Sequence, residues 1–146
     1  MHTLIRAATF FLLTTVAFNA QAGLRQLGTD FRTMMSNYTM INELQQRCPD
    51  ISLPSIKPKP HVERAMQNKL GIENYIQLQI SINKSDDKKS ALATIDKLWQ
   101  SIEGCQDPKL DAALQRIATV HGEAFARLEA EPGLVKAKDV PVPMRR

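Results

Sequence analysis

The sequence predicts a small all-α domain, most simply a four-helix bundle held by one disulfide. Three observations lead to this prediction. Beyond residue 23, apolar residues recur at steps of three and four along most of the chain, which is the spacing of amphipathic helices. Polar joints containing proline or glycine separate these periodic segments. The one stretch that alternates with a period of two has no partner strand elsewhere in the chain.

Residues 1–22 have the features of a secretory signal peptide. Arg6 precedes an apolar run from Ala7 to Phe18, and a small-x-small motif ends at Ala22. The apolar run is well short of the about 20 residues that a membrane-spanning helix needs. Cleavage after Ala22 would leave Gly23 as the N-terminus and 124 of the 146 residues, enough for one domain. We therefore expect an exported protein, in the periplasm or outside the cell, without stable membrane insertion after cleavage.

The first predicted helix covers residues 24–47. Its stripe continues in the same register to Gln45 and Cys48, and its apolar members are Leu24, Leu27, Phe31, Met34, Tyr38 and Ile41. Because Gln45 occupies a stripe position with Leu44 beside it, the helix either turns its packing face there or buries an amide that needs a partner.

An extended connector follows, because four prolines within residues 49–60 disfavour helix. A second helix is predicted over residues 61–82, interrupted at Gly71. Ile72, Ile76 and Ile80 are four apart, which favours helix, although Ile76, Leu78, Ile80 and Ile82 also alternate as in a strand. This segment has more apolar positions than one helical stripe needs. We expect the second helix to be buried nearly all round in the bundle; the alternative is that its second face is an interface.

Two further helices are predicted over residues 86–103 and 108–130. Gly104 ends the first of them, and Asp107 and Pro108 are a good N-cap and first residue for the second. The helical domain then comprises residues 23–131. Residues 132–146 form a basic tail that we expect to be extended or disordered.

Cys48 and Cys105 are the only cysteines of the chain, and in an oxidising compartment an even count predicts a disulfide. The bond requires the end of the first helix to meet the junction between the third and fourth helices. It therefore constrains the topology of the bundle.

The charge balance argues against a nucleic-acid partner. Residues 23–131 hold 14 Lys and Arg against 14 Asp and Glu, so the folded body is neutral. The positive excess of the mature chain lies in the tail, whereas nucleic-acid binding usually needs a basic face on the domain itself.

No catalytic group, metal site or cofactor motif is evident. The mature chain has only His61 and His121, and neither has a carboxylate or second histidine three or four residues away on its helix. His121 is the one suggestive residue, because it occupies a position on an apolar stripe. A haem or small-ligand site would use His121 with Met34 or Met35 opposite; the alternative is a core histidine bonded to a neighbour.

Three functional hypotheses follow. The first is an exported domain that binds another protein, as an inhibitor, an immunity-type protein or an accessory factor of the cell envelope or outside the cell, with a homodimer also open. The second is a bundle that binds haem or a small ligand at His121. The third is an exported helical enzyme with an arginine-lined site for an anionic substrate, and the available arginines are Arg32, Arg47, Arg64 and Arg116.

Overall fold

A computed structural model describes residues 5–134, with side chains described from Gly23 onward. These residues form five helices and no strand: α1 (Ile5–Arg47), α2 (Lys59–Leu70), α3 (Ile72–Lys84), α4 (Asp87–Ser101) and α5 (Pro108–Ala130). The all-α prediction is confirmed, but the expected four helices become five. The side chains of the predicted signal peptide and most of the predicted tail, residues 135–146, lie outside the described part. No helix in the described part is both long and apolar enough to span a membrane.

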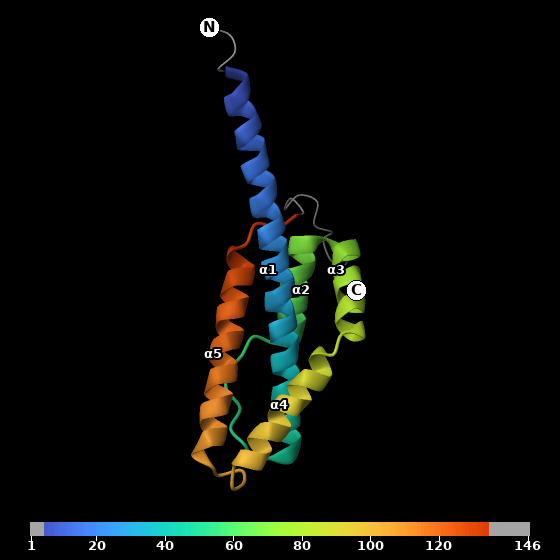
Figure 1. The fold of residues 1–146 in the computed structure, drawn as a ribbon. Coiled ribbons are helices and arrows are strands. Elements are labelled where there is room, and N and C mark those ends of the chain that lie inside the picture. Colours follow the sequence, from blue (N-terminus) through green and yellow to red (C-terminus); the bar gives the residue numbers. More distant parts are fainter. Residues whose placement is uncertain (1–4, 135–146) are drawn as a thin grey trace.

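The single helix predicted over residues 61–82 is corrected to two helices separated at Gly71. Gly71 has a φ of 78° and a ψ of 159°, and its N–H donates to the Gln67 carbonyl to close α2. A residue with a side chain rarely adopts this positive φ, so glycine ends α2 here and α3 can turn back beside it. The two helices lie side by side in Figure 1. The preference for helix over strand at residues 72–82 is confirmed.

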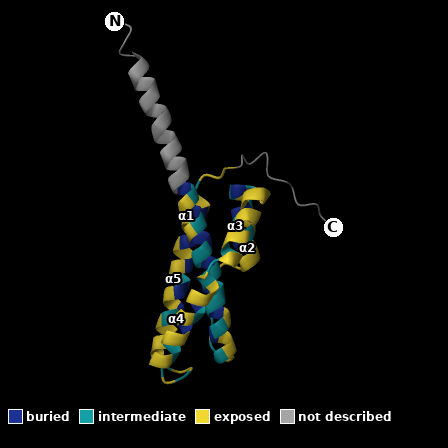
Figure 2. Cartoon of the chain, turned by 45° about the vertical axis from the view of Figure 1, so that its right-hand side comes forward, coloured by how far each residue is buried: buried dark blue, intermediate teal, exposed yellow. Residues whose placement is uncertain are grey.

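Helices α1 and α5 run antiparallel and form the axis of the molecule (Figure 1). Near one end, α2 packs against this pair, and the core there includes Phe31, Met66 and Phe125. Near the other end, α4 packs against α1, and the core there includes Leu44, Ile95 and Leu114. The core is divided into two clusters along α1, because α2 and α4 pack against different segments of that helix. Figure 2 shows the buried residues following α1 and α5.

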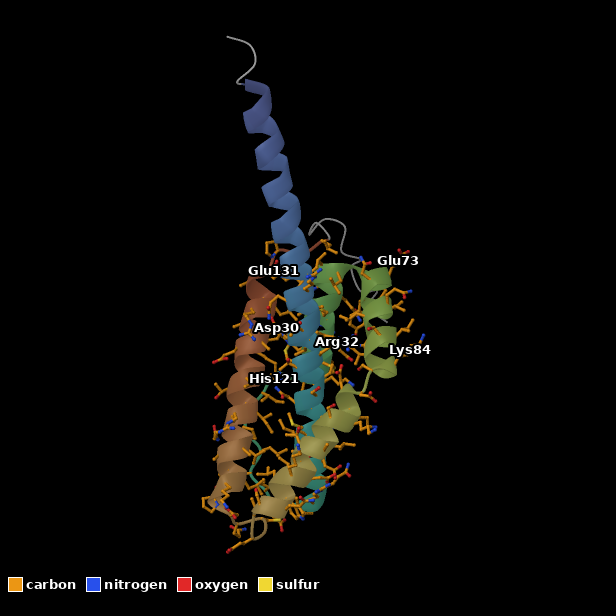
Figure 3. The ribbon with its side chains drawn as sticks, viewed as in Figure 1. Asp30, Arg32, Glu73, Lys84, His121 and Glu131 are labelled. Carbon is orange, nitrogen blue, oxygen red and sulfur yellow. A yellow bond between two sulfur atoms is a disulfide. The ribbon has the colours of Figure 1, made fainter. Side chains whose placement is uncertain are left out.

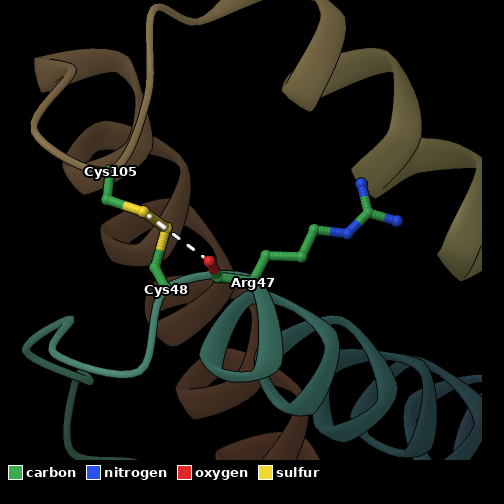
Figure 4. The surroundings of a disulfide bond; sticks show 3 residues. All are labelled: Arg47, Cys48 and Cys105. Carbon is green, nitrogen blue, oxygen red and sulfur yellow. Dashed lines mark hydrogen bonds between the residues drawn. A yellow bond between two sulfur atoms is a disulfide. The ribbon is translucent and has the colours of Figure 1, made fainter.

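The predicted disulfide is present. Cys48 and Cys105 are bonded with a Cα–Cα distance of 5.8 Å, and Cys105 Sγ lies 3.8 Å from the carbonyl oxygen of Arg47 (Figure 4). The bond joins the end of α1 to the loop between α4 and α5. On the last turns of α1, Leu44 is buried and Gln45 is exposed, so no amide is buried there. The buried positions of α1 keep one regular register to Cys48, so the packing face does not turn at its end.

The start of α5 follows its predicted cap. Asp107 Oδ1 accepts a hydrogen bond from the Lys109 N–H, and Oδ2 accepts one from the Glu103 N–H, both at 2.9 Å. These two backbone donors hold the pKa of Asp107 below its ordinary value. The proline connector lies against the body, because Ile51, Leu53 and Ile56 pack on the cluster around Leu44.

Candidate functional site

The most strongly paired polar group between α1 and α5 is Asp30, which is only 2% exposed. Arg127 Nη2 donates to Asp30 Oδ1 at 2.8 Å, and Arg127 Nε donates to the same oxygen at 3.1 Å. Gln26 Nε2 adds a third bond at 3.0 Å. The carboxylate raises the pKa of Arg127. A fully bonded carboxylate beside an apolar core is a structural pair, and its oxygens are not free for a substrate.

His121 lies on α5 and is fully buried on the side that faces α1 (Figure 3). Its ring meets the Tyr38 ring edge-on with centroids 5.0 Å apart, and its Nε2 lies 3.4 Å from the Tyr38 hydroxyl. That hydroxyl donates to the Lys57 carbonyl of the connector. Within the described residues, His121 Nδ1 has no hydrogen-bond partner. Tyr38 on α1 therefore contacts both the connector, at Lys57, and α5, at His121.

The structure does not bring the three residues of the haem hypothesis into one cavity. Met34 is buried in the cluster around Phe31, and Met35 lines a separate cavity bordered by α3 and α4 residues. The cavity beside His121 is lined by connector and α5 residues and by no methionine. Among the described residues, no group of three His, Cys, Asp or Glu side chains could hold a metal ion.

His121 should make folding sensitive to acid. Burial lowers its pKa, and a backbone interaction with Lys57 opposes this only in part. The unfolded histidine has a pKa of about 6.5, so the unfolded chain binds more protons as the pH falls through that value. The contribution of neutral His121 is full above about pH 6.5 and is lost as the pH falls toward its lower native pKa. We expect the free energy of unfolding, measured in urea at several pH values, to fall less steeply with acid in His121→Leu; equal slopes would contradict this role.

The four arginines of the enzyme hypothesis do not converge. Arg32 pairs with Asp87 at 2.7 Å, and Arg47 pairs with Asp96 at 2.6 Å. Both arginines lie on α1, 15 positions and therefore about 22 Å apart. Arg64 and Arg116 are exposed on α2 and α5. Among the described residues, the four arginines therefore do not meet in one shared pocket.

The most exposed apolar surface on a single helix lies on α3. Ile72, Ile76 and Ile80 are 52%, 47% and 41% exposed and stand one turn apart. The opposite side of α3 packs on the core through Tyr75, Leu78 and Ile82. Helix α3 lies at the edge of the molecule beside α2 (Figures 1 and 2). The expectation that this segment is buried nearly all round is therefore wrong, because α3 has a neighbour on one side only.

We call the surface formed by Ile72, Ile76 and Ile80 the isoleucine face. Its charged neighbours are Glu73 in the first turn of α3 and Lys84 in the last, which lie at opposite ends of the helix (Figure 3). At about 100° per residue, both charged residues flank the same side of the face. The face therefore has an apolar centre and a charge of each sign at its two ends.

Comparison with known proteins adds no relative. No family model matches the sequence, and neither a curated protein nor a solved structure is significantly similar to the chain.

Proposed function

We propose that this protein is an exported domain that binds another protein through the isoleucine face of α3. The observation that carries the proposal is the regular exposure of Ile72, Ile76 and Ile80, each more than two fifths exposed. Three large apolar side chains at four-residue spacing are the anchor pattern of a helix that docks into an apolar groove. Isolated exposed apolar residues are ordinary, but a contiguous row of them is typical of an interaction surface.

The flanking residues favour a protein partner. A helix that lies on a membrane surface usually has many Lys and Arg residues on its polar face, whereas α3 has one Lys and one Glu among amides. The folded body is also neutral, which disfavours nucleic acid. The partner that fits presents an apolar groove with a basic residue near Glu73 and an acidic residue near Lys84. An envelope inhibitor, an immunity-type protein or an accessory factor would each use such a surface.

Export is the other part of the proposal. The disulfide between Cys48 and Cys105 supports it, because such bonds persist mainly in oxidising compartments. Cleavage after Ala22 would place the new N-terminus at Gly23, which is buried against Glu131. The mass of the protein recovered from the periplasm or medium tests this part: the proposal requires a chain that starts at Gly23 and contains the bond. A chain that keeps residues 1–22 in the cytoplasm would contradict it.

A matched pair of variants tests the binding surface. Ile76→Asp places a charge at the centre of the isoleucine face, while Gln115→Asp places the same charge on an exposed position of α5, away from that face. We expect Ile76→Asp to weaken partner binding at least about tenfold and Gln115→Asp to leave it nearly unchanged. The measurement is the dissociation constant of the protein that the immobilised mature chain captures from envelope extract.

The outcomes separate the alternatives. If both variants weaken partner binding equally, or if neither weakens it, the isoleucine face is not the binding surface. Recovery of a second copy of this chain alone, with concentration-dependent mass in sedimentation, would replace the partner by self-association. Circular dichroism of both variants must match the wild type for either comparison to count, because each substituted position is exposed.

A further inference from the structure

A second apolar surface lies between α4 and α5, away from α3. Both helices pack toward α1, and they diverge from the loop that joins them (Figure 1). The groove between them has a volume of about 500 Å³, within the range of small-molecule sites. Its walls are predominantly aliphatic and include Ile95, Leu98, Ala112, Ala113, Ile117 and Val120.

The polar lining of this groove is cationic or neutral. Arg116 lines it and has no carboxylate partner among the described ion pairs, and no Asp or Glu is among the lining residues. Lys109 lies at the end nearer the loop, but its Nζ already donates to the Ser101 carbonyl at 3.0 Å. Asn37, on α1, is 3% exposed, and its Nδ2 makes only a long contact of 3.5 Å with the Ile117 carbonyl. A strong donor, Arg116, and a weakly bonded one, Asn37, therefore both border the groove.

We propose that this groove binds a single-chain amphiphilic anion of the medium-chain fatty-acid class. The carboxylate accepts hydrogen bonds from the Arg116 guanidinium, whose planar fork suits a carboxylate. The alkyl chain follows the aliphatic walls toward Lys109, seven residues or about 10 Å away along α5. The site is separate from the isoleucine face and does not depend on the function proposed above.

The lining of the groove suits an alkyl chain with one anionic end. Ala112 and Ala113 present only methyl groups on the α5 wall, and the other apolar lining residues named above are aliphatic. Arg116 supplies the charge preference at the rim.

Decanoate and 1-decanol test the proposal, because they share an alkyl chain and differ in charge. Titration calorimetry of the mature protein should give a dissociation constant for decanoate roughly tenfold below that for decanol. In Arg116→Gln this preference should disappear. In Arg64→Gln, which removes an exposed arginine from α2, it should remain as in the wild type.

A second variant tests the position of the alkyl chain. Ala113→Phe fills the groove from its wall and should weaken both ligands at least about tenfold, with circular dichroism as the check on folding. Failure of the folded wild type to bind either ligand below its micelle or solubility limit would overturn the proposal. So would a decanoate preference that survives in Arg116→Gln, binding unaffected by Ala113→Phe, or binding only to anionic lipid vesicles.

Discussion

Replacing both cysteines by serine is expected to lower the free energy of unfolding by about 2–4 kcal/mol and the melting temperature by roughly 10 °C. The Cys48–Cys105 bond joins residues 57 positions apart. A loop of that length loses much conformational entropy in the unfolded chain, which the chain-entropy model values at about 4 kcal/mol. The bond also holds the α4–α5 loop against the end of α1, where Cys48 is part of the core.

Thermal unfolding of the mature chain checks this expectation. The wild type should melt at a lower temperature when a reductant is present, and the Cys48→Ser, Cys105→Ser variant should melt near that lower temperature with or without reductant. The double variant is therefore its own control for other effects of the reductant. Equal melting temperatures for wild type and double variant would show that the bond does not stabilise the native state.

Arg127→Met is expected to lower the free energy of unfolding by about 2–3 kcal/mol. The substitution leaves the Asp30 carboxylate buried with only Gln26 as a side-chain partner. Removing one member of a fully buried ion pair typically costs about 3–5 kcal/mol. We expect less here, because the Arg127 side chain is 49% exposed and solvent screens part of the interaction.

A second substitution, Asp30→Leu, should compensate for the loss of Arg127. Asp30→Leu removes the stranded charge, so the variant with both Asp30→Leu and Arg127→Met should recover much of the stability that Arg127→Met alone loses. Urea unfolding of the wild type, the two single variants and the double variant measures the coupling. Arg25→Met, at an exposed position on α1, controls for loss of a positive charge. Additive effects would show that the two side chains do not stabilise each other.

The helical pattern of α1 was predicted well, but part of its packing face was displaced by one residue. The expected stripe members Leu24 and Tyr38 are half-buried and Gln45 is exposed, whereas the fully buried set adds Gly23, Asp30, Asn37 and Leu44. The members that the expected stripe and the buried set share are Leu27, Phe31, Met34, Ile41 and Cys48. An apolar pattern cannot reveal a buried Asp or Asn, because its burial depends on partners supplied by α5.

The division at Gly71 shows a second limit of the pattern. Apolar residues continue in helical register on both sides of Gly71, so periodicity alone indicates one long helix. The chain instead turns there, and residues that a straight helix would have pointed into the bundle are exposed on α3. The turn at Gly71 therefore creates the isoleucine face. Periodicity alone does not show this turn, so it predicted burial for residues that are exposed.

The candidate sites themselves could be predicted only in part. The disulfide followed from a count of two cysteines, and the burial of His121 followed from its stripe position. The groove between α4 and α5 could not be predicted, because it depends on the angle at which the two helices leave their loop. The arginine at its rim was named among four, but nothing in the sequence separates Arg116 from the others.

Site-specific photo-crosslinking in the cell of origin tests the central proposal, binding of a protein partner at the isoleucine face, most directly. A photoreactive phenylalanine analogue is placed in the full chain at position 76, 80 or 115, the last being an exposed glutamine on α5. We predict one discrete adduct with another protein from positions 76 and 80 and none from position 115. Absence of an adduct at positions 76 and 80, or the same adduct from all three positions, would contradict the proposal.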